Sequence, residues 1–233
     1  MINKIKKYFR VDNDPISFGN MSFSQCGEDL IIQYIFNLRG ISKPTYIDIG
    51  ANDPFSISNT ALFYKKGCRG INIEANPNLI ARFHRYRPDD VNLNIGVGSR
   101  NDKLNFHIMS DPTLSSFSKE ECDNYISTGK YNLVETKLLS LVTIKEIIDK
   151  YCNGTFPDFM SLDAEGMDYE ILKSIDFHGS VPKVICVESA EYSSIGAGDR
   201  RTELIDFLVD KGYYEYANTN LNAIMVKRDF WFI

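Results

Sequence analysis

Residues 45–52 read TYIDIGAN, and they are the clearest indication of the fold. An apolar run that stops at Gly50 predicts a buried strand followed by a tight turn, because glycine accepts backbone conformations that other residues avoid. Residues 59–66 then carry apolar side chains at helical spacing. A strand, a turn and a helix in this order form the repeating unit of a parallel α/β sheet.

The same pattern recurs along the chain. Apolar runs predict further strands at residues 70–74, 91–97, 159–163 and 184–188, and helical spacing predicts helices at residues 77–86, 143–151, 167–175 and 201–211. Asn76 is a good N-cap for the first of these helices, and Gly212 is a natural end for the last. Strands of this apolar content, joined by helices, indicate a parallel sheet covered on both faces.

The C-terminal part has a different character. Residues 213–217 and 221–226 flank Asn218-Thr219-Asn220, which predicts an antiparallel hairpin. Residues 101–140 are less regular, and we expect an extra strand at 104–109 and a loop at 110–118. The predicted fold class is α/β and Rossmann-like, with a mostly parallel seven-stranded sheet that ends in the hairpin. We expect a single domain over residues 24–233, preceded by an N-terminal helical extension over residues 1–23.

The composition of the 233 residues is typical of a globular protein with a small-molecule or protein partner. Hydrophobic residues make up 43% and charged residues 24%, and the net charge of −5 argues against nucleic acid as a partner. The five cysteines are widely spaced and form no Cys-x-x-Cys pair, which favours reduced thiols in the cytoplasm. No apolar run is long enough to cross a membrane. A homo-oligomer is compatible with this composition.

Acidic residues follow the predicted strands at the points where ligands bind in open α/β sheets. A row of acids on one rim of a sheet is costly unless the acids meet a cation, hydrogen-bond donors or a metal. These acids are Asp48, Glu74, Asp163, Glu165 and Glu188.

The first two acids predict a cofactor with an amino group and a ribose. Gly50 and Ala51 let the backbone approach a ligand, and Asp48 can meet its ammonium group. Glu74, at the end of the second strand, can accept both hydroxyls of a ribose. A nicotinamide dinucleotide is disfavoured, because Gly-x-Gly-x-x-Gly is absent and the Asp53 carboxylate would repel a phosphate. The alternative is a purely structural role, in which each acid only caps a turn.

The other three acids, Asp163, Glu165 and Glu188, indicate removal of a proton from a hydroxyl group. An alcohol is a poor nucleophile until its proton is removed, and a carboxylate within hydrogen-bond reach can remove it. Asp163 and Glu165, with Glu188 from the next strand end, could supply that base. They could also hold Mg²⁺ or Mn²⁺, which would lower the pKa of the hydroxyl. The alternative is that Glu165 merely begins the next helix.

The sequence resembles the FkbM family of S-adenosylmethionine-dependent methyltransferases from about Ser24 to Arg228. The matching pieces, in order, are SQCGEDL (24–30), YIDIGAN (46–52), SNT (58–60) with FY (63–64), GINIEANP (70–77) and LDAEG (162–166). Each piece alone is weak, whereas the ordered set is specific. The chain departs from many members of the family at Asp53-Pro54 and at Ala75.

The resemblance implies a class I methyltransferase fold that uses S-adenosylmethionine and methylates hydroxyl groups, commonly those of sugars. It places Asp163 and Glu165 against the acceptor, and a segment that includes Ser24 over the cofactor. The cofactor-binding residues carried over are Gln25, Asp29, Asp48, Gly50, Ala51, Asn52, Ser58, Asn59, Glu74 and Ala75.

The acceptor is the least constrained part of the prediction. From the resemblance we expect a sugar or a nucleotide-activated sugar. Ser115-Ser116-Phe117 and Glu191-Tyr192-Ser193 mix hydroxyls with aromatic rings, which suits a sugar but is equally typical of an ordinary loop. A non-carbohydrate hydroxyl, an amine, or a binding protein that has lost turnover are the alternatives. The run Gly196-Ala197-Gly198-Asp199 is a candidate hinge for a lid.

Overall fold

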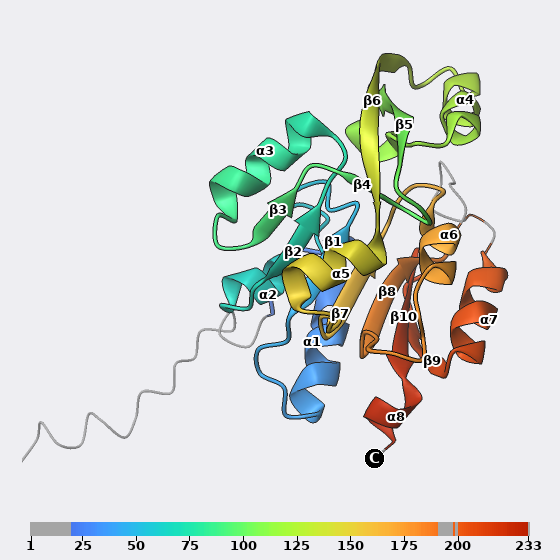
Figure 1. The fold of residues 1–233 in the computed structure, drawn as a ribbon. Helices are drawn as coiled ribbons and strands as arrows, with labels where there is room; N and C mark the ends of the chain where they lie inside the picture. Colours follow the sequence, from blue (N-terminus) through green and yellow to red (C-terminus); the bar gives the residue numbers. More distant parts are fainter. Residues whose placement is uncertain (1–19, 191–197, 199, 233) are drawn as a thin grey trace, which may run out of the picture.

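The computed structural model of the protein describes residues 20–190, 198 and 200–232. Strands alternate with helices along most of this length (Figure 1). The elements are α1 (Glu28–Leu38), β1 (Tyr46–Ile49), α2 (Ala61–Lys65), β2 (Gly70–Ile73), α3 (Pro77–Tyr86), β3 (Val91–Leu93), β4 (Gly96–Gly98), β5 (Asp102–Met109), the short 3-10 helix η3 (Pro112–Leu114), α4 (Lys119–Ser127), β6 (Leu133–Thr143), α5 (Ile144–Cys152), β7 (Phe159–Leu162), α6 (Asp168–Lys173), β8 (Val184–Glu188), α7 (Thr202–Asp210), β9 (Tyr213–Asn218), β10 (Asn222–Lys227) and α8 (Arg228–Trp231).

The main sheet has seven strands in the order β3-β2-β1-β7-β8-β10-β9. β1 lies between β2 and β7, and its Tyr46 pairs in parallel with Gly70 of β2 and with Phe159 of β7. β10 runs antiparallel to both of its neighbours. The predicted seven-stranded sheet with its C-terminal hairpin is thereby confirmed. The strand order reverses between β1 and β7, which is the place where open α/β sheets bind ligands.

Two apolar cores hold the sheet between its helices, because side chains alternate along each buried strand. Ile47 and Ile49 of β1 point into a core shared with α5, α6 and α7. Tyr46 points to the opposite face and packs in a core with α1, α2 and α8. On that same opposite face lies the Asp48 side chain, which is buried and polar.

A second sheet, in the order β4-β6-β5, stands at one side of the main sheet and carries α4 with it (Figure 1). The predicted single strand at 91–97 is wrong, since residues 91–93 belong to the main sheet and residues 96–98 to the second one. The ring of Phe117 packs closely on Gly96 at this point, where a Cβ would lie 2.5 Å from it. The strand β6 and the helices α1, α4 and α8 were not predicted at all.

The remaining differences concern the ends of elements and the N-terminus. The predicted helices at 59–66 and 167–175 are shorter, at 61–65 and 168–173, whereas the helix at 77–86 has the predicted bounds. Residues 20–23 contain no helix, and the rest of the predicted N-terminal extension lies outside the described residues. No helix in the described part of the chain is both long and apolar enough to cross a membrane.

Candidate functional site

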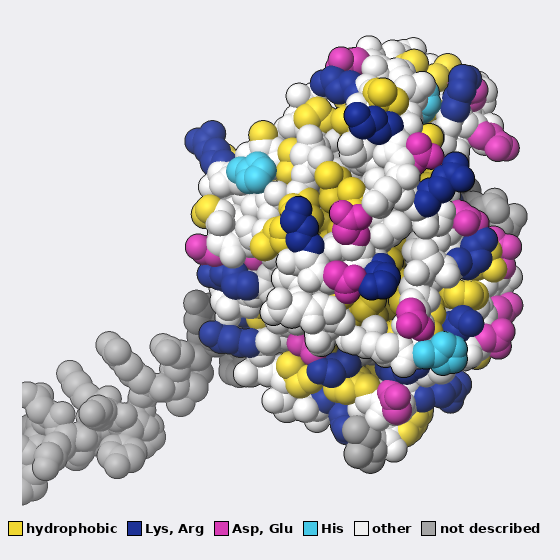
Figure 2. All heavy atoms as spheres, viewed as in Figure 1, with side chains coloured by type: hydrophobic (Ala, Val, Ile, Leu, Met, Phe, Trp, Pro, Cys, Tyr) yellow, Lys and Arg dark blue, Asp and Glu magenta, His cyan; other side chains and the backbone are white. Residues whose placement is uncertain are grey.

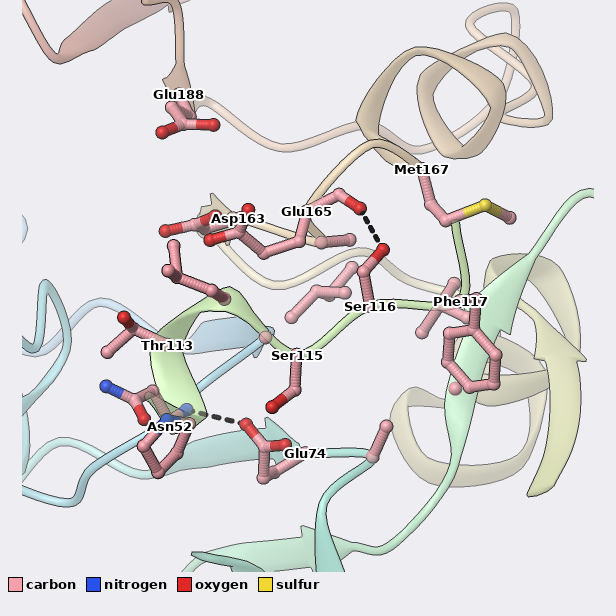
Figure 3. A pocket seen from close by; sticks show the side chains of 18 of the residues that line it. Asn52, Glu74, Thr113, Ser115, Ser116, Phe117, Asp163, Glu165, Met167 and Glu188 are labelled. Atoms are coloured by element: carbon pink, nitrogen blue, oxygen red, sulfur yellow. Dashed lines mark hydrogen bonds between the residues drawn. The ribbon is translucent and has the colours of Figure 1, made fainter. Parts of the chain in front are cut away.

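A cavity of about 450 Å³ lies beyond the carboxyl ends of β1, β2, β7 and β8. One side of it is formed by the main sheet and the other by β5, η3 and the segment at 115–117 that follows η3. Figure 3 shows Glu74 and Asn52 near one end of the cavity, with Asp163, Glu165 and Glu188 toward the other. The strand-end acids predicted to form one site thus meet in one cavity, with the exception of Asp48.

Glu74 is fixed at its end of the cavity by two backbone N–H groups. Asn52 N donates to Oε2 at 2.8 Å, and Asn76 N donates to Oε1 at 2.6 Å. Burial raises the pKa of Glu74 to about 7, against the lowering effect of these two hydrogen bonds. Each carboxylate oxygen has a second lone pair, so Glu74 can still accept hydrogen bonds from a ligand.

The turn after β1 depends on Gly50. Its φ is +77°, and a Cβ at this position would lie 1.7 Å from the carbonyl oxygen of Asp163. Gly50 therefore brings the β1 and β7 loops together, rather than only allowing a ligand to approach. Asn52, two residues later, also has a positive φ of 51°. Both residues line the cavity, as do the predicted cofactor residues Gln25 and Ala75.

The far end of the cavity is acidic. The Asp163 side chain is open to the cavity, although protein walls surround it, and its pKa is raised well above the usual range by desolvation and by the neighbouring charges of Glu165 and Glu188. Burial and the Glu188 charge raise the pKa of Glu165 to about 8. Burial also raises the pKa of Glu188 to about 7, opposed by Arg201. Glu165 and Glu188 are thus poised to exchange protons near neutral pH.

Glu165 is held by two contacts from the second sheet and its attached segments. The hydroxyl of Tyr125 on α4 donates to Glu165 Oε2 at 3.1 Å, and Ser116 Oγ donates to the Glu165 carbonyl at 2.5 Å. The backbone of Glu165 has a φ of +42°, an unusual value for a residue other than glycine. Such a conformation persists only where surrounding contacts enforce it, and it is a common feature of functional sites.

Arg201 is a residue of this site that sequence reasoning missed. Its guanidinium lies 3.6 Å from Glu188 Oε2, 3.7 Å from Asp168 Oδ2 and 3.9 Å from Glu121 Oε1. Asp168 is 2% exposed, and its Oδ1 accepts a hydrogen bond from Ala164 N at 2.7 Å. No short motif signals this cluster, because its members come from four separate segments.

Arg201 and Tyr125 also line a second hollow of about 490 Å³ between α4, α6 and α7. Glu121, Asp168 and Glu203 add acidic groups to its walls. Because Tyr125 and Arg201 line both hollows, the carboxylate end of the cavity lies next to the second hollow.

The metal prediction for Asp163, Glu165 and Glu188 is not supported. Within the described ranges no group of three or more His, Cys, Asp or Glu side chains is arranged to hold a metal ion. The guanidinium of Arg201 lies beside Glu188, so one of the three expected ligands already faces a cation.

Asp48 does not line the cavity; its carboxylate points into a buried polar network. Thr60 Oγ1 donates to Asp48 Oδ2 at 2.6 Å and accepts from Arg87 Nη1 at 3.0 Å. Arg87 is fully buried and pairs with Asp90 at 3.0 Å, and the Tyr46 hydroxyl donates to the same Asp90 oxygen at 2.6 Å. The network connects β1 and the N-cap of α2 with the end of α3.

Four further predicted cofactor residues lie behind the cavity wall. The Asp29 carboxylate accepts hydrogen bonds from Ser22 Oγ, Phe23 N, Ser24 Oγ and Leu30 N, which fixes the start of α1. The other three are Ala51, packed against Ile80 and Phe83; Ser58, which accepts from Ala61 N; and Asn59, which donates to Ser161 Oγ.

Asp53 has a different environment from the one expected. Its Oδ1 accepts hydrogen bonds from Phe55 N and Ser56 N, and its other oxygen pairs with Arg82. The Asp53 charge is therefore balanced locally and does not face the cavity. Of the expected acceptor loops, 115–117 lines the cavity, whereas 191–193 and the candidate hinge, apart from Gly198, lie outside the described residues.

Comparison with known proteins gives one family match. The family model described as "Methyltransferase FkbM domain" matches residues 48–214. No curated protein matches the chain.

Solved structures with similar folds are distant in sequence. A candidate caffeoyl-CoA O-methyltransferase from Staphylococcus aureus shares 11% identity, with 97% of this chain and 91% of that chain covered and a TM-score of 0.47. A precorrin-6y C5,15-methyltransferase from Geobacter metallireducens shares 15% identity, with coverages of 92% and 94% and a TM-score of 0.42. A 1,6-didemethyltoxoflavin N1-methyltransferase from Burkholderia thailandensis, with bound S-adenosylhomocysteine, shares 9% identity, with coverages of 96% and 84% and a TM-score of 0.39.

Proposed function

The chain belongs to the FkbM methyltransferase family, and from this premise we propose that it transfers the methyl group of S-adenosylmethionine to a hydroxyl of a sugar or a nucleotide-activated sugar. The observation that carries the proposal is the single cavity with Glu74 at one end and three carboxylates at the other. The first end suits a ribose, and the second suits deprotonation of a hydroxyl.

The cofactor fits the residues at the Glu74 end. Glu74 would accept the ribose hydroxyls, and the turn at Gly50 and Asn52 would face the methionine part. When bound, the cofactor supplies an activated methyl group on a positively charged sulfur. The acidic cavity favours such a cation and disfavours a phosphate-bearing dinucleotide. Asp48 would act from behind the turn, as part of its buried polar network.

Asp163 and Glu165 are the proposed bases at the other end. One of these carboxylates would accept the proton of the acceptor hydroxyl, and the bound cofactor would supply the methyl group and leave as a neutral thioether. Glu188 and Arg201 set the local charge, and Tyr125 orients Glu165 through its 3.1 Å hydrogen bond. The second hollow, next to these residues, would receive the rest of the acceptor.

An amine acceptor is the second candidate. Among the described residues that line the two hollows, Arg201 is the one Lys or Arg side chain. The carboxyl groups that line them include Glu121, Asp163, Glu165, Asp168 and Glu188. This excess of carboxylates favours an acceptor that carries a positive charge, such as an amino sugar.

Calorimetric titration with S-adenosylhomocysteine tests the cofactor end. Glu74→Gln keeps the size of the side chain but turns one acceptor oxygen into a donor that faces a backbone N–H. We expect binding to weaken by about tenfold or more, the loss of at least one hydrogen bond to a charged group. Glu170→Gln on the exposed face of α6 is the matched control. Equal affinity in both variants would contradict the assignment of Glu74.

Methyl transfer from labelled cofactor to a panel of nucleotide-activated sugars and amino sugars tests the acceptor end. With any acceptor that turns over, Asp163→Asn or Glu165→Gln should lower kcat by about a hundredfold or more, the usual contribution of a general base. Full turnover in both variants would overturn the proposed base. Turnover of amines alone would favour the second candidate.

A further inference from the structure

One edge of β6 has no partner among the described residues. β5 pairs with the other edge of β6 over residues 133–141, whereas β4 reaches only residues 141–143. Residues 133–140 thus present a row of free backbone N–H and C=O groups on the side where β4 stops. A free edge of this length is a template for pairing with another strand.

The side chains along this edge are exposed and partly apolar. Val134 is 66% exposed and Leu138 is 64% exposed, and Leu133 is 46% exposed. Figure 2 shows hydrophobic side chains beside Lys and Arg on the lobe that holds β5, β6 and α4. Proline, a common protection of free edges, is absent from residues 133–140.

The sequence of the edge is a chemical palindrome. Residues 133–139 read LVETKLL, with Thr136 at the centre, one acid before it, one base after it, and two apolar residues at each end. In an antiparallel pair related by a two-fold axis, residues equally far before and after the centre lie opposite each other. A strand with such a sequence is complementary to a second copy of itself.

We propose that two copies of this chain associate by antiparallel pairing of their β6 edges about Thr136, which joins the two small sheets into one. Glu135 then lies opposite Lys137 of the partner subunit. Val134 lies opposite Leu138 of the partner subunit, and each of these pairs occurs twice.

The charges select this register over its neighbours. Within one chain, Lys137 Nζ lies 3.2 Å from Glu135 Oε2, so pairing about Thr136 completes a group in which acids and bases alternate. A two-fold axis at Glu135 would place two acids opposite each other, and one at Lys137 would place two bases opposite each other. Like charges directly opposite each other destabilise a sheet. The pairing buries one strand edge only, so we expect a dimer with a micromolar dissociation constant.

Sedimentation equilibrium over a range of micromolar concentrations tests the proposal. The wild-type protein should show a monomer–dimer equilibrium. Glu135→Lys places lysines opposite lysines, and Lys137→Glu places glutamates opposite glutamates, so each variant should be monomeric at concentrations where the wild type is dimeric. The double variant restores both opposite-charge pairs and should dimerise again.

A mixture of the two single variants gives the sharpest test. Both lysines of the Glu135→Lys chain would face glutamates of the Lys137→Glu chain, so two monomeric proteins should form a heterodimer when mixed. Glu120→Lys on α4 changes the charge of the same lobe equally and should leave the dimer intact. Circular dichroism melting confirms that every variant is folded.

Three results would contradict the proposed dimer. A wild-type protein that stays monomeric overturns the proposal and leaves the edge to a different partner. A dimer that survives Glu135→Lys, or a mixture that stays monomeric, shows that this register does not form.

Discussion

Arg87 is a buried charged residue outside the cavity, and its contacts reach the strand that leads into the site. Its side chain is fully buried, pairs with Asp90 and reaches Asp48 through the hydroxyl of Thr60. Removal of one partner of a buried ion pair leaves an uncompensated charge. Arg87→Met should therefore lower the free energy of unfolding by about 3–5 kcal/mol.

Urea unfolding measures this loss. Arg100→Met is the matched control, because Arg100 forms an ion pair with Asp102 that is largely exposed. Exposed pairs contribute about 0–1 kcal/mol. Equal losses in the two variants would mean that the buried pair of Arg87 and Asp90 stabilises the protein no more than an exposed pair does.

Single residues also show how far the sequence could predict the site. Glu74, Asp163, Glu165 and Glu188 could be identified because each follows an apolar run, and strand ends meet at one edge of a parallel sheet. Arg201 could not, because its role arises only when carboxylates from other elements surround it. Asp48 follows the same strand-end rule, yet it points to the opposite face of β1, because side chains alternate along a strand.

Among the elements, the turn after β1 controls how closely two neighbouring strand ends approach. Gly50→Ala would place a Cβ 1.7 Å from the Asp163 carbonyl oxygen and would push the β1 and β7 loops apart. Gly129 has a similar φ of +72°, but a Cβ there meets nothing within 4 Å.

The two alanine substitutions thus separate backbone strain from steric overlap. Gly129→Ala should cost about 1 kcal/mol of stability, the usual cost of a left-handed conformation with a side chain. Gly50→Ala should cost several times more and should weaken binding of S-adenosylhomocysteine. Urea unfolding and calorimetry measure both effects, and equal losses of stability would refute the close approach.

Some helices and strands can be predicted from the sequence more easily than others. β1, β2, β7 and β8 could be predicted because they are buried on both faces and read as continuous apolar runs. β6 could not, since most of its residues are exposed and its apolar side chains follow no alternation. The break between β3 and β4 was missed because the chain changes sheets within one apolar stretch.

At the scale of the whole molecule, three glutamates with raised pKa values lie in one cavity. Glu74, Glu165 and Glu188 come from the ends of three strands, and their pKa values are raised to about 7, 8 and 7. In the unfolded chain a glutamate has a pKa of about 4.3. The folded protein therefore holds protons that the unfolded chain releases between these values.

This difference makes the stability of the whole protein depend on pH. A group whose folded pKa is raised contributes stability that is complete below its unfolded pKa and is lost as pH rises through the folded pKa. The melting temperature without ligand should consequently fall between pH 5 and pH 8, with no plateau at neutral pH. Asp158, whose pKa is lowered by Lys183 and Thr45, acts in the opposite direction, but below about pH 4 and outside this window.

Glu165→Gln tests the origin of the effect. Glutamine does not titrate, so the decline of the melting temperature from pH 5 to pH 8 should become shallower in this variant. Glu120→Gln, an exposed change on α4, should reproduce the wild-type decline. A melting temperature that rises over this range would show that Glu74, Glu165 and Glu188 are ionised at little cost, and that other charges must compensate them within the cavity.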